Sequence, residues 1–136
     1  IAWQEHPDYR ADQAYNEVLR LPLLGAGHET RAAIALALFY RYTGKDNPKR
    51  TSVAAALVSP ETVLRMKVLG QAARLGLTLS GGQPHLLKAF ALRLDETYLT
   101  LEAPAKQGEM VGEVVTRRLS TLAQVVGRSP RVSIRQ

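Results

Sequence analysis

Histidines are the residues of this sequence most able to act as acids, bases or metal ligands near neutral pH. There are three, His6, His28 and His85, and their spacing matches no metal motif. His28 and Glu29 are adjacent in "GAGHETRA", but the second histidine that an H-E-x-x-H zinc helix requires is missing. A helix start explains the pair better, with His28 capping or exposed to solvent and Glu29 near the positive end of the helix.

Other catalytic patterns are weaker still. No serine lies in a nucleophile elbow, and the absence of cysteine excludes disulfides and thiolate metal sites. "LSGGQP", residues 79–84, lacks the Gly-Lys-Ser/Thr ending of a phosphate loop and follows a predicted helix rather than a strand. We interpret it as a link between two parts of the chain. His6, in "HPDYR", has acidic, aromatic and basic neighbours, but a structural or surface role is the favoured interpretation.

The charge of the chain is the stronger chemical signal. Its 136 residues include 18 Lys and Arg against 12 Asp and Glu, a net charge of +6. Arginine dominates and grips phosphate or carboxylate in a bidentate fashion, so a polyanionic partner and an ordinary solvated surface both remain open. Arg41 and Arg74 lie in strongly apolar predicted helices, where a charge needs a partner. A buried carboxylate pair is favoured over a phosphate-binding groove.

Hydrophobic periodicity predicts helices in the first part of the chain. Residues 32–39 are consecutively apolar, which indicates a central helix buried on all sides, and Gly44 is expected to be its C-terminal cap. In "SPET", Ser59 is expected to cap the next long helix, with a proline at its first position. The predicted helices span roughly 8–21, 28–43, 51–58 and 60–79.

After Pro84 the pattern changes to alternation, which is typical of strands. It predicts a hairpin over 90–94 and 99–103, then a helix over 110–126 capped by Gly127, and then a short strand. The fold class is therefore mainly α, a helical bundle with a small β-β-α-β appendage, α+β overall. We expect domains at 1–82 and 83–136. No apolar run is long enough to span a membrane. The opening "IAWQEHP" suggests a piece of a larger protein.

Four stretches carry a family resemblance. In order they are "HPDYRADQAYNEVLRLPLLGAGHETRAAIALALFYRYTGK", "SPETVLRMKVLGQAARLGLTLSGG", "LRLDETYLTLEAP" and "GEVVTRRLSTLAQVVG". Their order and spacing resemble the C-terminal part of the Ppx/GppA family, the exopolyphosphatases and guanosine pentaphosphate phosphohydrolases. The resemblance implies an HD-like bundle that helps to bind a long polyanion and supports dimerisation.

The resemblance also implies what this chain lacks. In the family, two N-terminal actin-like domains hold the catalytic carboxylate, the phosphate loops and a divalent metal, expected to be Mg²⁺. The His-Asp dyad of an HD enzyme would fall before the first residue of this chain. We therefore expect a non-catalytic fragment with no cofactor of its own, in a cytoplasmic homodimer. The expected partners are those domains and polyphosphate or guanosine pentaphosphate; no membrane is expected.

Five residues fit the family pattern best and are the candidates for lining a polyphosphate groove: His6, Tyr9, Arg41, Tyr42 and Arg74.

Two other functions remain as alternatives. An autonomous HD-type nucleotide phosphohydrolase would need tightly bound divalent metal. A basic helical nucleic-acid-binding module is disfavoured, because there is no helix-turn-helix spacing and few aromatic residues for stacking.

Overall fold

The computed structural model describes residues 10–20 and 27–135. The chain divides into two compact units, 1–71 and 72–136, and the division falls within the long helix α4. The boundary expected at 82/83 lies just after the end of the same helix. The elements are α1 (Arg10–Arg20), α2 (His28–Tyr42), α3 (Ser52–Ala55), α4 (Pro60–Ser80), η3 (Pro84–Ala89), β1 (Ala91–Leu94), β2 (Tyr98–Pro104), η4 (Ala105–Met110), α5 (Glu113–Val125) and β3 (Ser129–Arg135).

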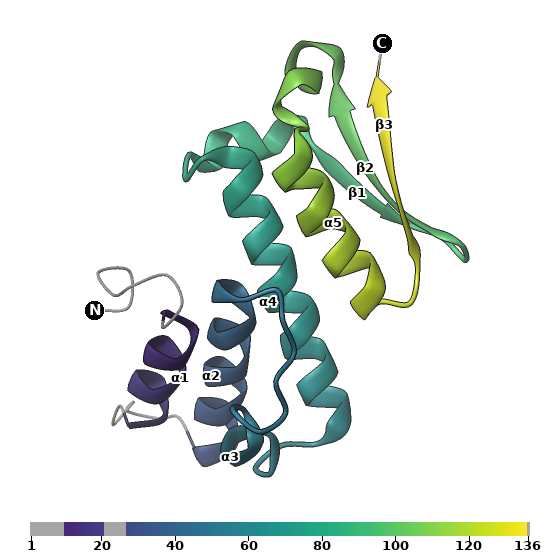
Figure 1. The fold of residues 1–136 in the computed structure, drawn as a ribbon. Helices are drawn as coiled ribbons and strands as arrows, with labels where there is room; N and C mark the ends of the chain where they lie inside the picture. Colours follow the sequence, from purple (N-terminus) through teal and green to yellow (C-terminus); the bar gives the residue numbers. More distant parts are fainter. Residues whose placement is uncertain (1–9, 21–26, 136) are drawn as a thin grey trace. The chain divides into compact units, whose positions relative to one another are not determined.

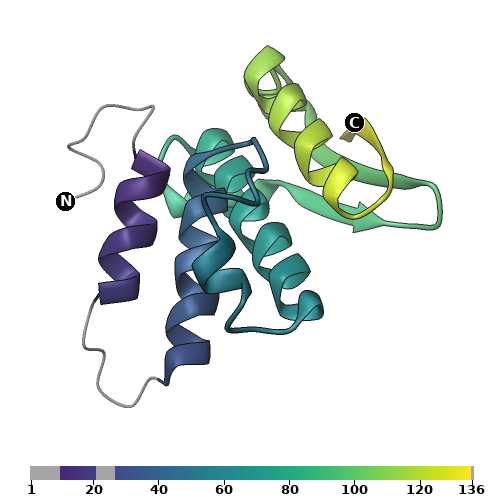
Figure 2. The same cartoon turned by 60° about the horizontal axis from the view of Figure 1, so that its bottom comes forward.

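The first unit is built around the side-by-side helices α1 and α2 (Figures 1 and 2). Phe39 of α2 is fully buried and meets the ring of Tyr15 of α1 edge to face at 6.0 Å. The Tyr15 hydroxyl accepts a hydrogen bond from the backbone N–H of Ala54 at 2.9 Å. This one tyrosine therefore joins α1 to α3 as well as to α2.

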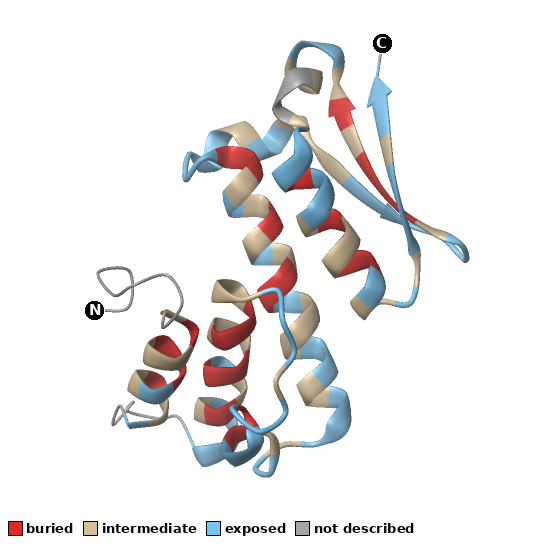
Figure 3. Ribbon diagram, viewed as in Figure 1, coloured by how far each residue is buried: buried red, intermediate tan, exposed pale blue. Residues whose placement is uncertain are grey.

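Helix α2 is buried on one face rather than on all sides, as Figure 3 shows. Its buried residues follow the i, i+3, i+4, i+7 pattern of a single stripe: Ala32, Ala35, Leu36, Phe39 and Tyr40. Ile34, within the same apolar run, is 38% exposed. The expectation of a helix buried on all sides was wrong. The small and apolar residues of the run occur all around the helix, whereas the neighbouring helices cover only one stripe of its surface.

The end of α2 also differs from the expectation. The helix ends at Tyr42, and Thr43 leaves it in an extended conformation while its N–H still bonds to the Phe39 carbonyl. Gly44 does not adopt the left-handed conformation of a C-terminal cap. The carbonyl of Thr43 accepts a hydrogen bond from the Gln71 amide at 2.9 Å instead. A tertiary contact from α4 thus binds the carbonyl just beyond the end of α2, and Gly44 does not cap the helix.

Gly70 permits a close contact between α4 and α2 in the first unit. A Cβ placed on Gly70 would lie 2.6 Å from the Ala37 carbonyl oxygen and 2.6 Å from the Tyr40 Cβ. Both are parts of α2 that cannot rotate away. Only glycine therefore lets α4 approach α2 at this point.

The predicted start of α4 is confirmed. The Ser59 hydroxyl accepts a hydrogen bond from the Thr62 N–H at 3.2 Å, the bond of an N-terminal cap. At the other end, Gly81 and Gly82 have φ of +58° and +85°, which ends the helix. Two expectations need adjustment: α3 is a single turn, and the sequence did not predict the 3₁₀ segments η3 and η4.

The second unit contains a three-stranded sheet of order β1-β2-β3. The predicted hairpin is confirmed as the antiparallel pair β1 and β2. The predicted last strand is β3, which pairs parallel to β2, so that α5 forms the crossover between them. The inner face of β2, with Leu99, Leu101 and Ala103, is buried on the same side as α5 (Figures 1 and 3).

The predicted cap of α5 is confirmed. Gly127 has a φ of +70°, and the N–H of Arg128 bonds to the Ala123 carbonyl at 2.9 Å, the six-to-one bond of a Schellman motif. This turn directs the chain straight into β3. Among the helices described, none is long and apolar enough to cross a membrane.

The Gly70 contact predicts that G70A lowers the free energy of unfolding by about 2–3 kcal/mol, because the new methyl group overlaps backbone atoms. The matched control is G76A in the same helix, where the new Cβ would meet only Leu87 methyl groups at 3.8 and 3.9 Å. That variant should gain about 0.5–1 kcal/mol from helix propensity. Urea unfolding followed by circular dichroism measures both, and equal stability of the two variants would contradict the close approach.

Candidate functional site

Two of the five candidate groove residues, Arg41 and Tyr42, lie together in the last turn of α2. The Arg41 guanidinium carbon is 4.4 Å from the centroid of the Tyr42 ring, a cation–π contact. Both residues are partly buried. Stacking on the ring leaves the in-plane N–H groups of a guanidinium available to a carboxylate or phosphate.

Arg74 belongs to the second unit, on the C-terminal part of α4. It is partly buried and already takes part in an interaction within the chain. His6 and Tyr9 lie outside the described residues. The structure thus brings Arg41 and Tyr42 together in the first unit, while Arg74 belongs to the second.

The loop that follows Arg41 and Tyr42 is held by a polar network around Asp46. The buried Tyr40 hydroxyl donates to Asp46 Oδ1 at 2.8 Å, and Lys67 of α4 forms an ion pair with the other carboxylate oxygen. The Lys67 ammonium is also 5.6 Å from the centroid of the Tyr40 ring. These contacts connect the end of α2 to α4 within the first unit.

The network shifts the pKa of two of its members. Burial, reinforced by the hydrogen bond to Asp46, raises the pKa of the Tyr40 phenol far above its ordinary value. Partial burial by itself would raise the pKa of Asp46, but the hydrogen bonds from Lys67 and Tyr40 outweigh it. The pKa of Asp46 therefore lies below its ordinary value, and the carboxylate stays ionised.

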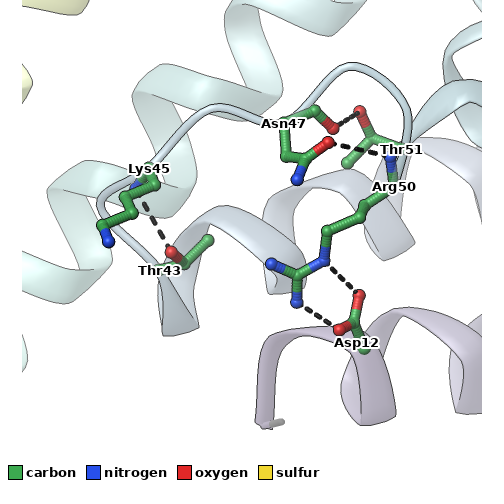
Figure 4. Close-up of polar contacts among 6 residues, drawn as sticks. All are labelled: Asp12, Thr43, Lys45, Asn47, Arg50 and Thr51. Atoms are coloured by element: carbon green, nitrogen blue, oxygen red, sulfur yellow. Dashed lines mark hydrogen bonds and ion pairs between the residues drawn. The ribbon is translucent and has the colours of Figure 1, made fainter. Parts of the chain in front are cut away.

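The far end of the same loop is tied to α1 (Figure 4). Arg50 Nε donates to Asp12 Oδ1 at 2.8 Å, its terminal nitrogen pairs with the other oxygen, and its guanidinium lies 5.1 Å from the Phe39 ring centroid. The hydrogen bond to Asp12 raises the pKa of Arg50. Asn47 Oδ1 accepts from the Arg50 backbone N–H at 3.3 Å, which closes the turn. Arg50 is therefore engaged in the fold and is not a candidate ligand.

His28 lies at the first position of α2 and is exposed, as is His85. The helix start is confirmed, although Gly27 occupies the cap position and no side chain caps it. Within residues 10–20 and 27–135, no group of three or more His, Asp and Glu side chains is arranged to hold a metal ion.

A cluster that sequence reasoning missed lies on the outer face of the sheet. A hollow of about 670 Å³ is lined there by Arg93, Leu94, Asp95, Thr100, Glu102, Arg131, Val132 and Ser133. The alternation in "LRL" and "RVS" places Arg93 and Arg131 opposite the apolar face of their strands. The sequence does not reveal that β1 and β3, the strands that carry these two arginines, both pair with β2.

Comparison with protein families gives one result. The family model for the exopolyphosphatase C-terminal region matches residues 1–133, nearly the whole chain, and confirms the resemblance inferred from the sequence. No curated protein matches the chain.

The lowered pKa of Asp46 predicts a pH dependence. Because its pKa is lower in the folded state than the unfolded value of about 3.9, the ionised carboxylate stabilises the fold above that value. The contribution is lost as the pH falls through the folded pKa. D46N should therefore be less stable than the unmodified chain at pH 7, and the difference should shrink in acid.

Urea unfolding at pH 7 and at pH 3 measures this difference, with E96Q, at an exposed turn carboxylate, as the control. A stability difference for D46N that is the same at both pH values would contradict the network.

Proposed function

The chain belongs to the exopolyphosphatase C-terminal family, and from this premise we propose that it holds the phosphate-chain substrate of an exopolyphosphatase. The reaction, release of terminal phosphate from polyphosphate or of the 5′ phosphate from guanosine pentaphosphate, is assigned to actin-like domains outside this chain. The chain contributes affinity rather than catalytic groups. The setting proposed for the whole protein is the cytoplasm.

The family match is the observation that carries this proposal, and the charge of the chain supports it. A net charge of +6, mostly from arginine, suits a partner that carries one negative charge on each repeating unit. Arg41, stacked on Tyr42 at the end of α2, offers a guanidinium whose plane is already fixed. Such a preorganised group loses less entropy when it binds a phosphate.

The divalent metal implied by the family does not fit the residues described here. A magnesium site needs carboxylate oxygens close together, and within the described ranges no three His, Asp or Glu side chains are so arranged. We therefore assign the metal to the actin-like domains, and no step in this chain depends on it.

The proposal predicts that the chain binds long-chain polyphosphate in preference to duplex DNA at equal phosphate concentration. Each arginine that contacts phosphate should add about 0.7 to the negative slope of log affinity against log salt. Replacing Arg41 and Arg74 together by glutamine should lower affinity about tenfold and flatten the slope by about 1.4. Fluorescence anisotropy with labelled polyphosphate at several salt concentrations measures both quantities.

The control is R65Q/R117Q, which removes the same charge from two exposed helical positions. Equal losses in the two double variants would show that only net charge matters and that Arg41 and Arg74 have no specific role in phosphate binding. Stronger binding to duplex DNA than to polyphosphate would contradict the proposed function.

Homodimerisation is the second part of the proposal. Large apolar side chains are exposed on the first unit, where a second copy could cover them: Ile34, Val53, Leu57, Leu64 and Leu69. Sedimentation equilibrium over a wide concentration range should show a reversible monomer–dimer equilibrium. A single monomeric species at every concentration would rule out this chain as a source of the dimer contact.

A further inference from the structure

We draw no further inference here: the strongest candidate, the outer edge of the sheet along β3, pairs with no strand other than β2 among the residues that the structure describes, and nothing in the structure shows what would cover this edge.

Discussion

The contact at Gly70 is the constraint on which the first unit depends. Because this residue has no side chain, the backbone of α4 can lie against the Ala37 and Tyr40 region of α2. Lys67, one turn earlier, then reaches Asp46, and Gln71, the next residue, reaches the Thr43 carbonyl. One absent methyl group thus sets the position of the loop that follows α2. Arg41 and Tyr42 stand where that loop begins.

The second unit depends on a different constraint, the parallel pairing of β3 with β2. The Gly127 turn sends the chain from α5 directly into β3, and the register places Arg131 beside Thr100. A shift of one residue would turn Arg131 toward the apolar face and Val132 outward. The outer face of the sheet therefore owes its charge to a register that the apolar face of β2 enforces.

The two units present positive charge in different ways. In the first, Arg41 stacks on Tyr42 at the end of a helix. In the second, Arg93 and Arg131 are fixed on a sheet by Glu102 and Thr100.

The sequence by itself determined most of the longer helices and strands, and the family. Local signals were sufficient for the Ser59 cap, the hairpin around Asp95, the Gly127 cap and the mainly α, α+β class, because each depends on neighbouring residues. The order of the four stretches was sufficient for the family.

Tertiary structure alone decided the rest. It gave the Thr43 carbonyl, just beyond the end of α2, a partner in Gln71, and it left Ile34 exposed, because the neighbouring helices cover one stripe only. It also joined Arg93 to Arg131, 38 positions apart, through a strand that pairs with both. Periodicity tells which face of a strand is polar. It does not tell which neighbouring strands add their polar residues to that face, because no local pattern contains the pairing of the strands.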